Sequence, residues 1–133
     1  MGIPKTIEAQ ASFFDNGANS SCSMAFKYDN NIIALLKSTL LEDTPKEAIF
    51  YCEKGTIKIN KSFFAPTTVT IVAEEKAEII DFNYTTIGYN YEIIHFNQLL
   101  RQEKTESNIM SFEFSLELIK TLDRIRHLIG LKY

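Results

Sequence analysis

Residues 88–133 read GYNYEIIHFNQLLRQEKTESNIMSFEFSLELIKTLDRIRHLIGLKY, and this run encodes two amphipathic helices. Apolar side chains recur there at helical spacing, first at Tyr89, Ile93, Phe96 and Leu100 and then at Phe114, Leu118, Leu122, Ile125 and Ile129. Ser111 is placed to cap the second helix, and Gly130 is placed to end it. Each helix therefore has one apolar stripe that needs a surface to pack on.

The part of the chain before these helices is rich in strand signals. Short apolar or alternating segments are separated by turn residues, and they span residues 7–14, 20–28, 32–41, 47–52, 55–59, 68–72 and 77–82. The turns between them are short, which favours hairpins and antiparallel pairing. Strands first and helices last predict an α+β fold, an open and mostly antiparallel sheet of six to seven strands with two C-terminal helices packed on one face.

Length and composition narrow the class of protein. The chain has 133 residues, of which 45% are hydrophobic, so we expect a single domain over residues 1–133 with its own core. A net charge of -3 gives no electrostatic basis for binding nucleic acid or an anionic membrane. No apolar run reaches the roughly 20 residues of a membrane helix, and the first residues lack the apolar core of a signal peptide. A cytoplasmic location is therefore expected.

The segment at residues 32–36, IIALL, is apolar on both faces of its expected strand. This pattern is typical of a central strand that is covered from two sides. The helices would cover one face of the sheet. The other face needs a cover of its own, and the loop at residues 61–68 is one candidate.

Several short patterns resemble one enzyme family. They are Gly-Tyr-x-Tyr-Glu at 88–92, Arg101, Lys-x-Glu-Ser at 104–107, Met110, and Asp-x-x-Arg at 123–126 followed by Gly130 and Tyr133. In this order they resemble the C-terminal end of the Gfo/Idh/MocA oxidoreductases, in the branch similar to dimeric dihydrodiol dehydrogenase. Asn19 departs from the pattern because Asp is usual there. Glu103 replaces a usual Gly, which predicts a first helix that runs a turn longer.

The resemblance implies that nucleotide binding and substrate binding belong to two different domains. Members of that family join an N-terminal dinucleotide-binding Rossmann domain to a C-terminal domain with an open sheet, and this chain resembles only the second. It is expected to be the substrate-binding and dimerisation domain of an NAD(P)-dependent oxidoreductase that acts on a sugar-like or diol substrate. The resemblance also implies a homodimer through the open sheet face, as an isologous contact. NAD or NADP would be held by the missing Rossmann domain.

The motifs for cofactor chemistry are missing from the sequence. A dinucleotide site needs a Gly-rich turn of the type G-x-G-x-x-G, and the glycines stand apart at Gly2, Gly17, Gly55, Gly88 and Gly130. The Glu-Lys-Pro motif, which carries the family's proton-transfer lysine, is also absent. We therefore expect no catalytic and no cofactor-binding residue here, and a chain that is inactive alone. Whether it is part of an enzyme stays open at this point.

A few side chains are candidates for other roles. Tyr89 and Tyr91 are candidates for lining a substrate cleft by family analogy, with packing in the core as the alternative. His95 is a candidate because it lies beside the apolar face of the first helix and could face a pocket, with packing against the sheet as the alternative. His95 and His127 are too far apart to suggest a metal site. Cys22 and Cys52 lie in apolar strands, which predicts buried free thiols.

Two uses of the polar strand face compete. Ser21 and Ser23 would line either a substrate site or the dimer interface, and their burial distinguishes the two. A second hypothesis for the whole chain is a free-standing, non-catalytic ligand-binding or scaffold domain of the same fold. A closed cavity with convergent polar groups in a monomer would favour that hypothesis.

Overall fold

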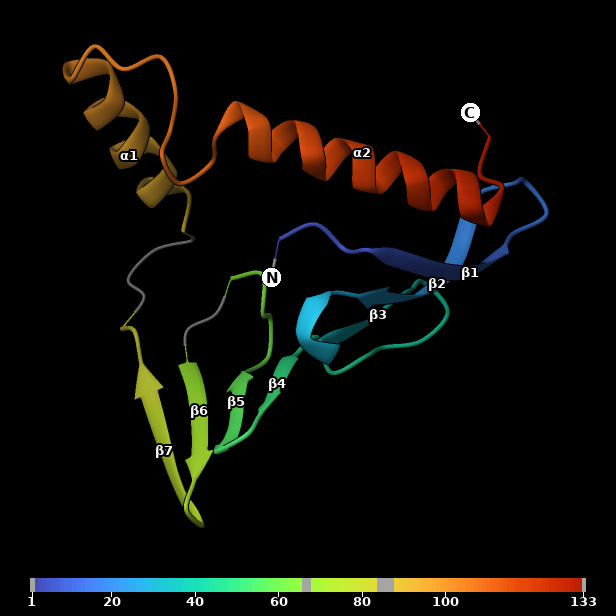
Figure 1. Cartoon of the computed structure of the whole chain (residues 1–133), viewed down its shortest axis with the longest axis horizontal. Helices are drawn as coiled ribbons and strands as arrows, with labels where there is room; N and C mark the ends of the chain where they lie inside the picture. Colours follow the sequence, from blue (N-terminus) through green and yellow to red (C-terminus); the bar gives the residue numbers. More distant parts are fainter. Residues whose placement is uncertain (1, 66–67, 84–87, 133) are drawn as a thin grey trace. The chain divides into compact units, whose positions relative to one another are not determined.

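The computed structural model describes residues 2–65, 68–83 and 88–132, and it contains seven strands and two α-helices within those ranges (Figure 1). They are β1 (Thr6–Phe13), β2 (Asn19–Lys27), β3 (Ile33–Thr39), β4 (Ala48–Cys52), β5 (Gly55–Ile59), β6 (Thr68–Ala73), β7 (Lys76–Asp81), α1 (Tyr89–Arg101) and α2 (Phe112–Ile129). Every pairing between these strands is antiparallel. The sequence predicted an α+β fold with the strands before the helices along the chain and with mostly antiparallel pairing. These predictions are confirmed.

The seven strands lie in two open sheets, where the sequence suggested one. The first has the order β1-β2-β3 and the second β4-β5-β6-β7. The chain divides accordingly into two compact units, Met1–Asp43 with Glu106–Tyr133, and Thr44–Thr105. We refer to them as the three-stranded unit and the four-stranded unit. The expectation of one domain over residues 1–133 stays a prediction.

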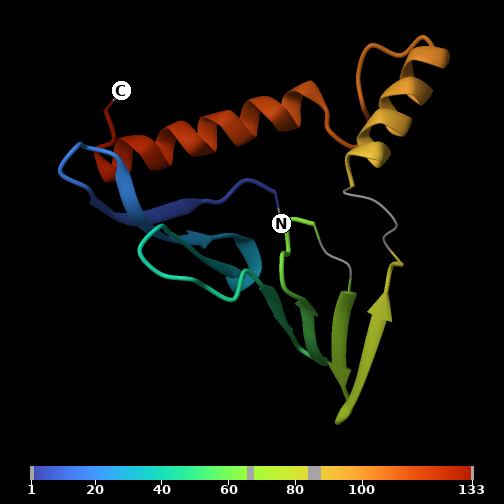
Figure 2. The ribbon, with the colours of Figure 1, turned by 180° about the vertical axis from the view of Figure 1, so that it is seen from behind.

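The core of the three-stranded unit lies between its sheet and α2. Paired residues of antiparallel strands share a face, and the pairs Ile7 with Phe26 and Ala11 with Cys22 belong to the same face. Ile7, Cys22 and Ile125 of α2 are buried. The helix packs on β1 and runs alongside it in both views (Figures 1 and 2). Only the C-terminal end of the stripe predicted for the second helix is covered, since Ile125 is buried and Ile129 is half-buried, whereas Phe114, Leu118 and Leu122 are exposed.

The position of β3 differs from the prediction. In the described part of the chain β3 pairs with β2 alone, so it is an edge strand of its sheet. The prediction of a central strand is therefore wrong. Ile33, Leu35 and Leu36 are exposed, and the cover of the open face by a second copy stays a prediction. Pattern alone identifies an apolar strand, but neighbours in the sheet are decided by hairpin connections. Of the loop at residues 61–68, residues 66 and 67 lie outside the described ranges.

The four-stranded unit is a meander of three hairpins. Gly55 follows the β4–β5 turn at a φ of 153°, and the β6–β7 turn contains Glu74 and Glu75, both with positive φ. Lys58 Nζ of β5 pairs with Glu47 Oε1, the residue directly before β4, at 2.9 Å. Among the described residues of this unit, α1 has no extensive packing on a strand.

The ends of the two helices have different chemistry. The Phe114 backbone N–H donates to Ser111 Oγ at 3.1 Å, and Gly130 takes a left-handed conformation after α2. Both predicted end signals are confirmed. The prediction of a longer first helix is wrong, because α1 ends at Arg101 and Glu103 takes a φ of 55°. Glutamate thus adopts the backbone conformation that glycine favours at such a position.

Replacing Glu103 by glycine is expected to stabilise the protein. A residue with a Cβ loses roughly 1–2 kcal/mol in the left-handed region, while glycine loses about 0.5–1 kcal/mol through its greater freedom when unfolded. The net gain for Glu103→Gly should be about 0.5–1 kcal/mol in urea unfolding followed by circular dichroism. Glu103→Ala is the control, since it removes the side chain and keeps the strain. An equal gain from alanine would contradict this explanation.

Candidate functional site

The predicted site residues Tyr89, Tyr91 and His95 all lie on α1. Tyr91 and His95 are four residues apart and share one side of the helix, whereas Tyr89 lies two residues before Tyr91 and faces elsewhere. Both tyrosines are exposed and His95 is half-buried. The alternative of tyrosines packed in the core is therefore wrong. The helix alone brings two of the three residues together, and their role as substrate contacts stays a prediction.

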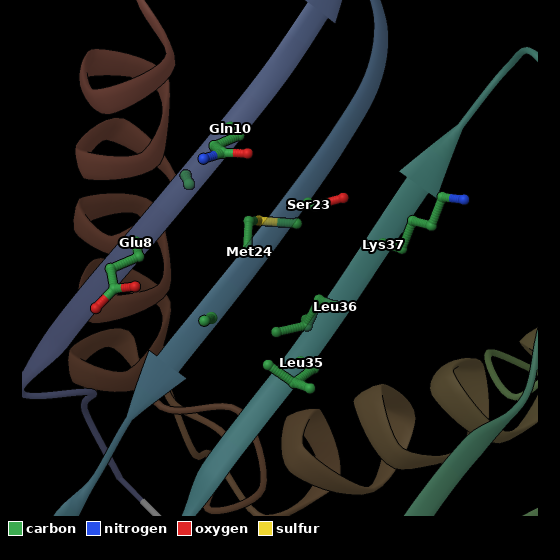
Figure 3. A pocket seen from close by; sticks show the side chains of 9 residues that line it. Glu8, Gln10, Ser23, Met24, Leu35, Leu36 and Lys37 are labelled. Carbon is green, nitrogen blue, oxygen red and sulfur yellow. The ribbon is translucent and has the colours of Figure 1, made fainter.

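A hollow of about 430 Å³ lies over the three-stranded sheet (Figure 3). All three strands contribute to its lining, which consists of Glu8, Ala9, Gln10, Ser23, Met24, Ala25, Leu35, Leu36 and Lys37. The strand register places Gln10 beside Ser23 and Ser23 beside Lys37, so these three residues form one polar row across the sheet. The next row, Glu8–Ala25–Leu35, is mixed. The hollow is open to solvent, unlike the closed cavity expected of a free-standing ligand-binding domain.

The charged residues around the hollow are paired locally. Lys27 Nζ donates to Glu8 Oε1 at 2.6 Å, and Lys37 pairs with Glu42. Exposed pairs of this kind contribute little to stability, at most about 1 kcal/mol each. They also leave no concentration of one sign of charge at the hollow. The lining has the character of a contact surface with mixed polarity, without a nucleophile paired to a base.

The two serines of the polar strand face, Ser21 and Ser23, differ in exposure. Ser23 is exposed and lines the hollow, while Ser21 is half-buried and does not. The exposure of Ser23 is compatible with both a ligand and a second subunit. The hollow also includes Gln10 and Lys37, which the sequence analysis missed. Gln10 and Lys37 are polar positions in strands that alternate between polar and apolar residues. Together with the register of the two hairpins, this alternation could have placed both residues beside Ser23.

The two cysteines are both free thiols, but they differ in exposure. Cys22 is buried and Cys52 is exposed, so the prediction is confirmed for the first and wrong for the second. Cys52 ends β4, an edge strand, directly before the turn into β5. Burial raises the pKa of the Cys22 thiol, because the interior disfavours the charged thiolate.

A thiol reagent should therefore distinguish the two cysteines. At pH 8 we expect one label per chain, at Cys52, with Cys22 reacting at least about tenfold more slowly because its thiol is covered and its pKa is raised. Because a raised pKa means fewer thiolates at a given pH, labelling of Cys22 should increase only as the pH rises further. Peptide mass spectrometry measures both rates. Cys52→Ser should abolish the fast reaction, and first labelling at Cys22 would contradict the assignment.

The described residues do not form a metal or dinucleotide site. Within residues 2–65, 68–83 and 88–132, no group of three or more His, Cys, Asp or Glu side chains could hold a metal ion. Dinucleotide binding uses a turn between a parallel strand and a helix, and the strands described here are all antiparallel. The residues present thus do not fit NAD(P). No helix in the described ranges is long and apolar enough to cross a membrane.

Two curated relatives match nearly the whole chain. Trans-1,2-dihydrobenzene-1,2-diol dehydrogenase of Xenopus tropicalis is 27% identical over 138 residues, covering 98% of this chain and 41% of the relative. The Danio rerio protein of the same name is 24% identical over 136 residues, with the same coverage. The chain is similar to the C-terminal part of these dehydrogenases. It spans about two fifths of their length, and no family model matches the sequence.

Solved structures show the same fold. UDP-N-acetylglucosamine 3-dehydrogenase GnnA from Acidithiobacillus ferrooxidans superposes with a TM-score of 0.80 at 11% identity, over 96% of this chain and 40% of that one. Biliverdin reductase from Synechocystis, solved with biliverdin and NADP+, gives a TM-score of 0.76 at 13% identity, over 98% and 42%. The resemblance to the C-terminal domain of Gfo/Idh/MocA oxidoreductases is thereby confirmed.

Proposed function

We propose that this chain is the C-terminal, substrate-binding and dimerisation domain of an NAD(P)-dependent oxidoreductase that acts on a sugar-like or diol substrate. The observation that carries the proposal is the match of 98% of the chain to 41% of a diol dehydrogenase. The shared fold with a nucleotide-sugar dehydrogenase, GnnA, supports it. The location proposed for the protein is the cytoplasm.

The chain's own residues would bind and orient the substrate in this scheme. The phenol groups of Tyr89 and Tyr91 and the imidazole of His95 all offer hydrogen bonds that suit substrate hydroxyls. Hydride transfer belongs to the nicotinamide, and the nucleotide is held by a Rossmann domain outside these 133 residues. The chain alone should be inactive, because its antiparallel sheets present no turn for the pyrophosphate.

A second copy of the chain is the proposed partner of the open sheet face. Leu35 is 80% exposed and projects from the face opposite to the one that contains Ile7 and Cys22. An exposed apolar side chain on the open face of a sheet is suited to an isologous sheet-to-sheet contact. In sedimentation velocity, Leu35→Glu should weaken association at least about 30-fold. Leu40→Glu is the matched control, since Leu40 is 77% exposed but lies beyond the end of β3.

The assignment to a larger oxidoreductase is tested by the size of the native product. An antibody raised against this chain should detect, in the source cells, a protein more than twice its mass, which leaves room for a nucleotide-binding domain of about 150 residues. The purified chain, titrated with NADH and with NADPH, should show no change in nucleotide fluorescence. A native product of only 133 residues would overturn the proposal and favour a free-standing ligand-binding or scaffold domain.

A further inference from the structure

The turn between β1 and β2 contains Asn16 followed by Gly17, and both residues are exposed. Two backbone hydrogen bonds close this turn, since Phe14 N–H donates to Ala18 O and Gly17 N–H donates to Phe14 O, both at 2.9 Å. Gly17 has a φ of 83°, and no described atom beyond its chain neighbours lies within 4 Å of a Cβ built on it. The junction between the two residues is therefore uncrowded and open to solvent.

The side-chain amide of Asn16 is held at its oxygen and free at its nitrogen. Ala18 N–H donates to Asn16 Oδ1 at 3.0 Å. A donor in this position withdraws electron density from the amide carbon and stabilises negative charge that develops on the oxygen. In the described part of the chain, Asn16 Nδ2 has no hydrogen-bond partner. The amide carbon is thus activated toward a nucleophile, and its NH2 group is not anchored.

Asn19, at the start of β2, provides the contrast within the same hairpin. It is also followed by a small residue, Ser20, but its Nδ2 donates to Ser12 O at 3.2 Å and to Ser21 O at 3.1 Å. Ser20 is only 4% exposed. At this second junction the nitrogen that would leave is bonded, and the residue that would attack is buried. The fold therefore favours reaction at Asn16 over reaction at Asn19.

We propose that Asn16 is a site of spontaneous deamidation, with water as the only co-reactant. The Gly17 backbone nitrogen gives up its proton and attacks Asn16 Cγ, so that an N–Cγ bond forms and the Cγ–Nδ2 bond breaks. Nδ2 leaves as ammonia, which takes up the proton that Gly17 lost. Water then opens the cyclic imide at either of its two carbonyls and gives aspartate or isoaspartate. No group is oxidised or reduced, and one negative charge is added to the chain.

The closed turn controls when this reaction occurs. Gly17 N–H is bonded to Phe14 O, so the nitrogen can attack only after this hydrogen bond opens. An exposed turn opens locally at a lower free energy than global unfolding. The two products then differ in their effect on the hairpin. Aspartate still accepts from Ala18 N–H, in a charge-assisted hydrogen bond, whereas isoaspartate adds a methylene to the main chain and disrupts the pairing of Phe14 with Ala18.

Peptide mass spectrometry of the full chain, incubated at pH 8 and sampled over days, measures conversion at each asparagine. Asn16 should convert at least about tenfold faster than Asn19, which corresponds to a barrier lower by about 1.4 kcal/mol. Isoelectric focusing should show a new acidic form, because one added negative charge takes the net charge from -3 to -4. Asn16→Gln is the control, since its longer side chain closes a ring less readily, and it should abolish the acidic form.

Two further measurements test the role of Gly17 and of the turn. Gly17→Ala should slow conversion at Asn16 about tenfold, because the methyl group crowds the attacking nitrogen; the strain that it adds favours opening, so slower conversion identifies crowding as the cause. Unfolding the chain in urea should speed conversion, because Phe14 O then releases the amide. Equal rates at Asn16 and Asn19 in the folded chain would overturn the proposal, as would an acidic form that persists in Asn16→Gln. Conversion at Asn16 only in urea would also overturn it.

Discussion

Replacing Gly55 by alanine should unfold the four-stranded unit or destabilise it by about 4 kcal/mol, the sum of backbone strain and a clash that cannot relax. Gly55 has a φ of 153°, and a Cβ built on it would lie 2.1 Å from the Val72 carbonyl oxygen and 3.1 Å from the Ala73 Cα. Both atoms belong to the backbone of β6, which pairs with β5 at this point. The strands must separate to admit the methyl group, and hydrogen bonds of the ladder are then lost.

Urea unfolding followed by circular dichroism, together with hydrogen exchange of β5 and β6 amides, measures this effect. Gly17→Ala is the matched control, because Gly17 also has a positive φ, 83°, but no atom lies within 4 Å of its added Cβ. It should lose about 1 kcal/mol through strain alone. Equal losses from the two variants would show that the close approach to β6 is not what requires glycine.

The local elements were predictable because their signals are carried by neighbouring residues. The helix that begins at Phe112 and ends at Ile129 follows from Ser111, Gly130 and an apolar stripe with a period of 3.6. The strands follow from alternation and from turn chemistry, and β5 was predicted with the bounds Gly55–Ile59. Such signals require no knowledge of what lies across the sheet.

The arrangement of those elements was less predictable because it depends on distant partners. The apolar run of β3 indicates burial, but it does not say whether a neighbouring strand, a helix or another molecule supplies it. Cys52 illustrates the same limit, since its apolar neighbours predicted burial and its place on an edge strand exposes it. Glu103 shows a second limit of prediction from sequence. Turn geometry imposes a positive φ on this glutamate, although residues with a Cβ disfavour that conformation.

In the candidate site, too, the features set by local sequence were predictable and those set by long-range pairing were not. The apolar spacing that predicted the first helix placed Tyr89, Tyr91 and His95 on it, and α1 contains all three. The polar row Gln10–Ser23–Lys37 was missed because it exists only through the register of three strands. A single sequence shows each residue as one polar position in an alternating strand. Pairing turns them into a surface, and that step depends on long-range contacts.

Ile125→Ala should cost about 3 kcal/mol of the stability of the three-stranded unit, the usual range for deleting a buried isoleucine side chain to Cβ. Ile125 is 8% exposed and is the buried residue of α2. Most of the stability of a helix in a protein comes from the packing of its apolar face, so packing on β1 provides much of the stability of α2. The buried apolar set in the described chain is small, namely Pro4, Ile7, Cys22 and Ile125. Few neighbours can therefore move to fill the cavity.

The change should lower the urea midpoint of the helical signal and increase hydrogen exchange along α2. Leu128→Ala removes a similar side chain from an exposed site on the same helix and should cost less than about 1 kcal/mol. Leu116→Ala is a second control, because Leu116 is exposed and lies on the side of α2 opposite to Ile125. If Leu116→Ala lowered the stability of the isolated chain as much as Ile125→Ala, both sides of α2 would be packed within one molecule. If only Ile125→Ala does so, α2 is held on its sheet through one side alone.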